Sequence, residues 1–337
     1  MIDLNPFASD ADADVVVPFH NLSLRETHPR RAFLTTDEFR ARFDRPQMEQ
    51  QFFGVIDAGE LAALGVAMWW VDGTNTHLLF LQNLVRPDMR QQGLGRQVLR
   101  RALEVTLERG RSMLIADIID TVPAGAAFAL TVGADLGLNE HMNVVAVSDL
   151  DTEMLERWMT EGPGRAEGYE LLAWADTYPE EHHGQLARLF VMADEDAPFE
   201  DAAFEPQAET AETVKERLER SEGFVERVTS VVRHVESGAI VGFSEVVMVQ
   251  KGSPSLNTSL TVVDRDHRGH AIGKWIKADA ILRGIERYPD VTHIETENAF
   301  SNAPMLGIND EIGFRPEHTL MAYQATVDTV RTYLDRS

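Results

Sequence analysis

The chain has 337 residues, more than one ordinary domain contains, and with 44% hydrophobic and 26% charged residues it has the composition of a folded protein. Asp and Glu number 55 against 31 Lys and Arg, and this net charge of −24 argues against nucleic-acid binding. The surplus either serves only to keep the protein in solution or favours a cationic or amine ligand. The absence of cysteine excludes disulfides, thiolate metal sites and a cysteine nucleophile. No apolar run approaches the roughly eighteen residues of a membrane helix, and the acidic start lacks signal-peptide features, so we expect a cytoplasmic protein without membrane contact.

Hydrophobic periodicity in the first half predicts strands alternating with helices. The turn Asp57-Ala58-Gly59-Glu60 contains a glycine that can adopt positive φ, so we expect a hairpin there. In chain order we expect a strand over 14–19, a helix over 36–50, hairpin strands over 52–56 and 64–70, a long strand over 76–85, a helix over 94–109, a strand over 112–119, a short helix over 124–132 and a strand over 143–147.

The second half repeats this order. We expect a strand over 169–176, helices over 181–193 and 209–221, hairpin strands over 225–235 and 239–249, a strand over 256–263, a helix over 272–287, a strand over 291–296, a helix over 303–311 and a strand over 319–326. Between the halves, Gly162-Pro163-Gly164 is the strongest helix breaker in the chain. The sequence therefore predicts domains over 1–150 and 169–337, joined by a linker over 151–168.

One motif recurs after 178 residues. Arg90-Gln91-Gln92-Gly93-Leu94-Gly95 follows the apolar run 78–85, and Arg268-Gly269-His270-Ala271-Ile272-Gly273 follows the run 260–263. In both places the motif lies between a predicted strand and the start of a predicted helix, where backbone N–H groups and the helix dipole favour a phosphate. The repeat therefore predicts two copies of one domain, each with a phosphate-binding loop.

These loops resemble the Gln/Arg-x-x-Gly-x-Gly/Ala signature of the GNAT superfamily of acyl-CoA-dependent N-acyltransferases. The resemblance covers both halves and implies an α/β (α+β) fold of two tandem GNAT-like domains, an architecture similar to that of mycothiol synthase. Each domain would contain a mixed, largely antiparallel sheet with a splayed central strand flanked by helices. A Rossmann dinucleotide enzyme is excluded, because the glycine loops follow antiparallel hairpins and do not open a βαβ unit.

The resemblance also implies acetyl-CoA as cosubstrate, its pantetheine paired with the strand before each loop and its pyrophosphate held by the loop. Ala271, in place of the middle glycine, should narrow the space for the pyrophosphate. No metal is expected, since the spacings of His182, His183, His267 and His270 fit no ordinary zinc site. The expected cofactor-binding residues are Leu84, Val85, Arg90, Gln91, Gln92, Gly93 and Gly95 in the first copy and Val262, Val263, Arg268, Gly269, His270, Ala271, Gly273, Asn298 and Asn302 in the second.

A second family motif concerns the leaving group. GNAT enzymes often carry Asn-x-x-Ala-x-x-Leu-Tyr-x-x-x-Gly-Phe after the fifth strand, with the Tyr acting as acid toward the CoA thiolate. The second copy has Asn302 at the first place, Gly313-Phe314 at the end and Asn309 where the Tyr should stand. An amide can donate a hydrogen bond to the sulfur but cannot protonate it. In the first copy, we align Gly137 with the glycine of the motif. This alignment places Ala126 at the position of the motif Asn and Gly133 at the position of the motif Tyr.

A base must take a proton from the attacking ammonium, and Glu245 is the first candidate, with His77 as the second. The alternative interpretation makes Glu245 a solvated hairpin residue and His77 a structural one. The acidic run 194–201 either attracts an amine to the acceptor site or is a solvated loop. Because the second copy keeps more polar groups near the sulfur, we expect the chemistry there, with Glu245 and Asn309 as catalytic residues.

The predicted function is therefore acetyl transfer from acetyl-CoA to a primary amine by direct attack in a ternary complex. The acceptor would be a small molecule that can be cationic, and the protein a monomer or homodimer. The alternative is a non-catalytic acyl-CoA-binding or sensor protein with a degenerate GNAT fold, because the acid is missing from both copies.

Overall fold

The computed structural model describes residues 1–44, 47–206 and 208–336. The chain forms two compact units, the first from Met1–Glu140, Phe199–Glu205 and His318–Ser337, the second from His141–Pro198 and Pro206–Glu317. These units differ from the expected domains 1–150 and 169–337. The last strand of the first half passes into the second unit at His141, and the last strand of the chain passes into the first unit at His318.

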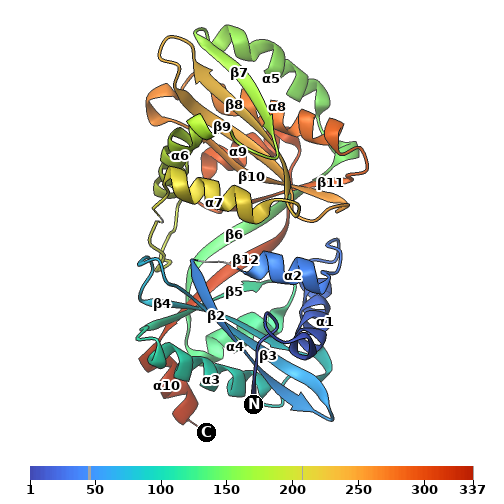
Figure 1. The fold of residues 1–337 in the computed structure, drawn as a ribbon, viewed down its shortest axis with the longest axis vertical. Coiled ribbons are helices and arrows are strands. Elements are labelled where there is room, and N and C mark those ends of the chain that lie inside the picture. Colours follow the sequence, from blue (N-terminus) through green and yellow to red (C-terminus); the bar gives the residue numbers. More distant parts are fainter. Residues whose placement is uncertain (45–46, 207, 337) are drawn as a thin grey trace. The chain divides into compact units, whose positions relative to one another are not determined.

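The sheet of the first unit ends with a strand from the C-terminus of the chain (Figure 1). Its neighbours pair antiparallel except for one central parallel pair, β4 with β5. β12 enters this unit from His318 onward and pairs with β5. The strand order is β1 (Ile2–Leu4), β2 (Met48–Asp57), β3 (Glu60–Trp70), β4 (Leu78–Val85), β5 (Met113–Ile119) and β12 (Arg315–Thr326).

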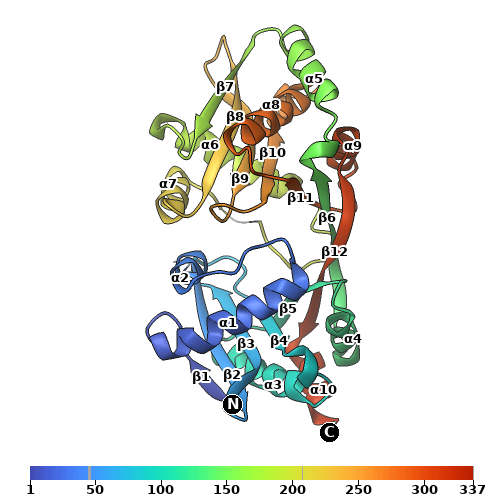
Figure 2. The same cartoon turned by 90° about the vertical axis from the view of Figure 1, so that its right-hand side faces the viewer.

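Helices cover both faces of this sheet. The adjacent residues Phe52 and Phe53 point to opposite faces, as the period of a strand requires. Phe52 packs with α1 (Asp10–Thr27) and α2 (Thr36–Phe43), whereas Phe53 packs with α3 (Leu94–Glu108). The C-terminal helix α10 (Val327–Asp335) packs against α3 and α4 (Pro123–Val132), and Figure 2 shows it beside them.

The predicted strand over 14–19 is wrong, because these residues lie inside α1. Ser9 caps the helix by accepting from the N–H of Asp12, and the buried positions Ala13, Val16 and Val17 follow a helical spacing. Packing of this face against β3 outweighs the strand propensity of the valines. The predicted helix over 36–50 ends earlier, at Phe43, and β2 begins at Met48.

The sheet of the second unit begins with β6, the strand that closes the first half of the sequence. Its parallel pair is β10 with β11. On one face, α6 (His183–Asp196) and α7 (Ala211–Ser221) pack on Val231 and Phe243, and on the other face α8 (Ile272–Arg287) packs on Val232 and Val241. The strand order is β6 (Asp135–Ala146), β11 (His293–Ala299), β10 (Ser255–Val263), β9 (Ile240–Met248), β8 (Glu226–His234) and β7 (Tyr169–Ala175).

The predicted linker is a helix, α5 (Thr152–Arg165), although it contains the breaker Gly162-Pro163-Gly164. Asp151 caps its start, and Met154, Leu155, Trp158 and Gly162 form its buried face. Gly162 is needed because a Cβ there would lie 2.5 Å from the Trp275 ring of α8. The glycine therefore permits close helix packing and does not end the helix.

Among the residues that the structure describes, no helix is long and apolar enough to cross a membrane. The helix α9 (Ala303–Ile312) follows β11 in the second unit as α4 follows β5 in the first. Short 3-10 turns precede α3 and α8, at Pro87–Met89 and Arg265–His267. Each unit thus presents the same order of strand, loop and helix at its centre.

Candidate active site

The central strands of the first unit separate. β4 and β5 pair only at Leu78 with Met113, Leu79 with Leu114 and Phe80 with Ile115. Beyond these pairs, β4 stays bonded to β3 up to Val85, and β5 stays bonded to β12. The facing edges of the two strands are therefore unpaired with each other, and a gap opens in the sheet.

A cavity of about 570 Å³ occupies this gap. It is lined by α1 on one face and by α3 and α4 on the other, so it passes through the sheet. Every lining residue belongs to the first unit. Those from the strands and the loop that follows are Asn83, Leu84, Val85, Arg86, Pro87, Arg90, Gln91, Gly93, Asp117, Ile118 and Ile119.

The loop between β4 and α3 has the backbone of a phosphate nest. Gln91 and Gly93 are both left-handed, with φ of 60° and 79°, and Gly93 is the N-cap of α3 without a side-chain cap. Left-handed residues turn neighbouring N–H groups toward one side, and the first turn of a helix leaves its N–H groups free. A Cβ built on Gly93 meets nothing within 4 Å, so the space in front of the loop is open.

Arg90 holds this loop in place. Its Nε donates to the carbonyl of Val85 at 3.3 Å, and its two terminal nitrogens donate to the carboxylate of Glu26 at 2.8 and 2.5 Å. Glu26 lies in the last turn of α1. The guanidinium therefore connects α1 to the end of β4.

Two polar residues of the separated strands line the cavity. Asn83 on β4 donates through Nδ2 to the carbonyl of Gly95 at 3.0 Å, and its buried Oδ1 has no hydrogen-bond partner in the described residues. Asp117 lies on β5 beyond the last residue paired with β4. Gln92, an expected ligand, is not among the lining residues, and its amide contacts the sulfur of Met89. Sequence analysis missed Asn83 and Asp117, which lie outside any motif.

The second unit has the same separation of strands. β10 and β11 pair only at Ser255 with His293 through Asn257 with Glu295. A register shift between Thr258 and Leu260 marks a bulge in β10, whereas β4 shows no such shift against β3. Val262 and Val263 lie beyond the separation point, paired to β9 on one side.

At the two left-handed positions of the second loop, glycine comes first and the non-glycine residue second, the reverse of the order in the first loop. Gly269 has φ of 88° and Ala271 has φ of 59°, at the positions of Gln91 and Gly93. Each loop therefore has one glycine and one other residue at its two left-handed positions, and Ala271 keeps the backbone shape. A Cβ on Gly273 would lie 3.8 Å from Val263, and His270 packs near the ring of Tyr169.

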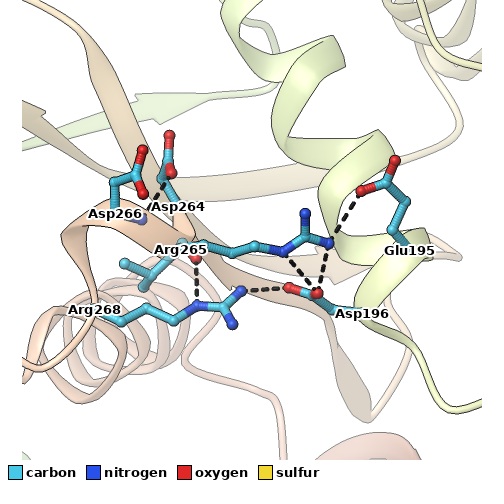
Figure 3. A network of polar contacts seen from close by, with 7 residues as sticks. Glu195, Asp196, Asp264, Arg265, Asp266 and Arg268 are labelled. Carbon is cyan, nitrogen blue, oxygen red and sulfur yellow. Dashed lines mark hydrogen bonds and ion pairs between the residues drawn. The ribbon is translucent and has the colours of Figure 1, made fainter.

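Acidic residues at the end of α6 hold the arginines of the second loop (Figure 3). Arg268 donates to the carbonyl of Val263 at 2.9 Å and to Asp196. Arg265 donates to Asp196 at 2.6 Å and to Glu195 at 3.0 Å. The hydrogen bond from Arg265 lowers the pKa of Asp196. The structure thus uses the first part of the acidic run 194–201 in ion pairs.

The end of this run lies in the segment Phe199–Glu205, which belongs to the first unit. His77, the second candidate base, donates through Nε2 to the carbonyl of Ala203 at 2.8 Å, and Asn75 exchanges two hydrogen bonds with the backbone of Glu205. Phe204 stacks on Phe80. The structural interpretation of His77 thus fits these contacts, since its ring holds this segment.

Glu245 is buried and is not a solvated hairpin residue, with 6% of its surface exposed. Its carboxylate accepts a hydrogen bond from the hydroxyl of Tyr178 and another from Thr229 at 3.0 Å. Burial, together with the charge of Glu245, raises the pKa of Tyr178. Arg227 also donates to the Tyr178 hydroxyl, at 3.3 Å. The polar cluster is therefore internally bonded on the face covered by α6 and α7.

Three asparagines lie in or next to α9. Asn302 is its N-cap and accepts from the N–H of Met305 at 3.3 Å. Asn309 is buried, donates to Asn298 on β11 at 2.6 Å, and leaves its Oδ1 without a partner in the described residues. Nδ2 of Asn309 carries a second hydrogen, so the amide retains a donor.

The alignment on Gly137 that was expected to match the first copy to the leaving-group motif is wrong. Gly133 and Gly313 both end their helices in left-handed conformation, and the N–H of each bonds to the carbonyl four residues back, at Ala129 and Asn309. The helix ends thus make Ala129 the counterpart of Asn309, and Val122 the counterpart of Asn302, in place of Gly133 and Ala126. The offset is 178 at the starts of α3 and α8 but 180 at the starts of β5 and β11, so the second copy is two residues longer between these points, which Gly137 did not reveal.

The neighbouring histidines His182 and His183 each contact a different residue of the second unit. His182 stacks on Trp174 at 5.3 Å between ring centroids, and His183 bonds to the carbonyl of Tyr178 at 3.0 Å. Within residues 1–44, 47–206 and 208–336, no three His, Asp or Glu side chains form a group that could hold a metal ion.

Comparisons with known proteins agree with this geometry. Residues 17–130 match the family model of the acetyltransferase (GNAT) family, and no curated protein matches the sequence. A solved tandem GNAT protein from the clavulanic acid biosynthesis pathway aligns over 97% of this chain and 98% of its own, with a TM-score of 0.79 and 23% identity. The chain has a tandem GNAT fold. A GCN5-related N-acetyltransferase from Sphaerobacter thermophilus aligns over 97% and 95%, with a TM-score of 0.65 and 16% identity.

The GNAT fold supports acyl transfer in general terms. The matched residues 17–130 contain β4, the Arg90 loop, β5 and most of α4, which together form most of the cavity. The expected two-copy GNAT architecture is confirmed, and the first unit is the one that the family model recognises.

Proposed function

We propose that the first GNAT unit transfers an acetyl group from acetyl-CoA to a primary amine. The observation that carries this proposal is the cavity that passes through the sheet from the Arg90 loop to the α1 face. The cosubstrate can bind on the side of α3 and α4 and the acceptor on the side of α1, so that both meet between β4 and β5. Holding two reactants in such a gap supplies much of the rate of a direct attack.

The residues present fit an acyl-CoA. The left-handed loop with open space before Gly93 suits a pyrophosphate. The unpaired edge of β4 at Leu84 and Val85 can hydrogen-bond the amides of pantetheine. The unpartnered Oδ1 of Asn83 can accept from a pantetheine N–H, which would satisfy a buried polar atom.

Asp117 is the carboxylate placed to take the proton. The nitrogen of the amine attacks the thioester carbon, the C–N bond forms as the C–S bond breaks, and CoA leaves as a thiolate. The attacking ammonium must lose a proton for this to occur, and Asp117 lines the gap where it would stand. Ala129 occupies the place of the usual Tyr, so the thiolate takes its proton from solvent.

The expected site in the second unit, with Glu245 and Asn309, stays a prediction. A matched pair of variants decides between the units. Gly95→Leu should abolish turnover, because Gly95 lines the cavity, whereas Gly273→Leu should leave most of it. A Cβ at either position meets only ordinary contacts of 3.7 or 3.8 Å, so both variants should fold. The reverse result would move the site to the second unit.

The test of activity separates an enzyme from a binding protein. Acetyl-CoA should raise the melting temperature, whereas NAD and ATP should not, and a panel of primary amines should release free thiol from acetyl-CoA. An unchanged melting temperature would refute the acyl-CoA assignment. Stabilisation without thiol release from any amine would favour the alternative of a non-catalytic acyl-CoA-binding or sensor protein.

A further inference from the structure

The last helix of the chain forms part of the cavity wall in the first unit. α10 buries Val327, Val330 and Leu334 in the core that it shares with α3. Arg96 on α3 donates to the carbonyl of Leu334 at 2.7 Å, so a cation meets the negative end of the α10 dipole. These contacts fix Tyr333, which lines the cavity.

Tyr333 belongs to an aromatic cluster beside the phosphate loop. Its ring lies edge-on to Phe128 of α4, with centroids 6.1 Å apart, and the guanidinium of Arg96 lies 5.3 Å from its centroid. The tip of the Phe128 ring would be 3.7 Å from a Cβ on Gly95. The cluster therefore adjoins the first turn of α3, where the loop presents its N–H groups.

We propose that Tyr333 contacts the adenine of the bound CoA, and this inference rests on the proposed function. CoA joins its pyrophosphate to pantetheine on one side and to adenosine on the other. Pantetheine would follow β4, so the adenosine must leave the loop in another direction, toward exposed elements. Adenine is a flat π-system, and an aromatic ring with a nearby guanidinium is a suitable partner for it.

The assignment makes the two ends of the sequence parts of one site. The family model ends at residue 130, and Tyr333 lies outside it. The ring of Tyr333, with Phe128 edge-on to it and the Arg96 guanidinium beside it, is the part of the side chain assigned to this contact. Tyr333 is then a cofactor-binding residue that acts on affinity and not on the chemical step.

The experiment compares Tyr333→Leu, Tyr333→Phe and the control Thr332→Ala, an exposed neighbour on the same helix. Binding of acetyl-CoA and of acetyl-pantetheine, which lacks the nucleotide, is measured by calorimetry, and kinetics follow thiol release. We expect Tyr333→Leu to weaken acetyl-CoA about tenfold, to raise KM with kcat unchanged, and to leave acetyl-pantetheine binding unchanged. Tyr333→Phe, which keeps the ring, should retain the affinity for acetyl-CoA, whereas Thr332→Ala is the control and should match the wild type in binding and kinetics.

Two results would overturn the proposal. Equal weakening of acetyl-CoA and acetyl-pantetheine by Tyr333→Leu would place the ring against the pantetheine arm or show a structural effect. Unchanged acetyl-CoA affinity in Tyr333→Leu would show that the ring does not contact the cofactor. If the wild type itself binds no acetyl-CoA, the proposed function fails. That result is distinguishable from the two results for Tyr333→Leu, which both require a wild type that binds acetyl-CoA.

Discussion

Both carboxylate oxygens of Glu26 accept hydrogen bonds from the guanidinium of Arg90, at 2.8 and 2.5 Å. In the second unit, the equivalent Arg268 bonds to Asp196 in the last turn of α6. The motif arginine of each unit is thus held by a carboxylate at the end of a helix, and its Nε holds the carbonyl five residues earlier. This arrangement makes it a positioning residue for the loop.

The Arg90–Glu26 pair should show measurable coupling. Each side chain is about 30% exposed, and a bidentate pair of this kind has good geometry. We expect Arg90→Ala and Glu26→Ala each to lower the free energy of unfolding by about 1 kcal/mol, and the double variant to lose little more than either. Urea unfolding of the four proteins measures this. The exposed pair of Arg331 with Asp328 is the control, and full additivity at Arg90 and Glu26 would contradict the prediction.

Gly162 should tolerate no larger residue. A Cβ there would overlap the Trp275 ring at 2.5 Å, so Gly162→Val should lower the free energy of unfolding by about 1–3 kcal/mol. Gly164 lies in the same helix with nothing within 4 Å of a Cβ, and Gly164→Ala should stabilise by up to about 1 kcal/mol. Thermal and urea unfolding test both variants, and equal effects would show that helix propensity alone matters.

The buried side chain of Lys277 should lower the free energy of unfolding of the wild type. It lies on α8 with 1% of its surface exposed, has no ion pair or hydrogen bond within the described part of the chain, and its Nζ lies 5.7 Å from the Phe314 ring centre. Burial lowers its pKa to about 7. Leu99 occupies the same place in α3. Lys277→Leu should therefore raise the free energy of unfolding at pH 7 by at least about 1 kcal/mol.

The pH dependence of the Lys277 effect provides its control. The unfolded state holds the proton up to about pH 10.4, whereas the folded state releases it near pH 7. The wild type therefore loses stability as pH falls from that upper value toward 7. Lys277→Leu should reduce this loss, and a difference between the proteins that is constant from pH 7 to pH 10 would contradict the prediction.

Acid should weaken the first unit through its histidines. Burial, with a contribution from Arg42, lowers the pKa of His20 to about 4, and burial lowers that of His28 to about 3. The unfolded state binds protons from pH 6.5 downward while the folded state does not, so stability is full above pH 6.5 and falls as pH drops toward 4. The slope approaches about 1.4 kcal/mol per pH unit for each histidine.

Replacing one histidine tests this. In His20→Gln, the slope of unfolding free energy between pH 6 and pH 4.5 should decrease, and His28 should account for part of the remaining slope. His20 packs edge-on against Phe39 and Phe43, so the variant will lose some stability at every pH. Unfolding curves at four pH values separate that constant loss from the slope. Equal slopes in the two proteins would show that His20 is not the titrating group.

Local patterns in the sequence predicted most elements of both units. The hairpins, the loops after β4 and β10, and helices α3 and α8 could be predicted because apolar spacing and turn residues determine them locally. α1 and α5 could not, because packing on β3 and on Trp275 decides their structure against local propensity. The exchange of β6 and β12 leaves no local signal, since a strand reads the same whichever sheet it joins.

The candidate site was predictable in part. The loop glycines and the strands before them follow a motif, and the separation of β4 from β5 was expected from the family. Asn83 and Asp117 are ordinary strand residues whose position relative to the gap depends on pairing register. Tyr333 lies about two hundred residues beyond the other lining residues, so only the folded chain brings it to the cavity.

The exchange of final strands means that this chain cannot be divided into two independent proteins by one cut. A piece ending at residue 150 would lack β12, and the backbone groups of β5 from Met113 to Ile119 would lose the partner that they have on that edge in the whole chain. The remaining piece would lack β6 and leave β11 open in the same way. Separate expression of the halves should therefore give insoluble products, whereas coexpression of the two pieces should restore a soluble pair.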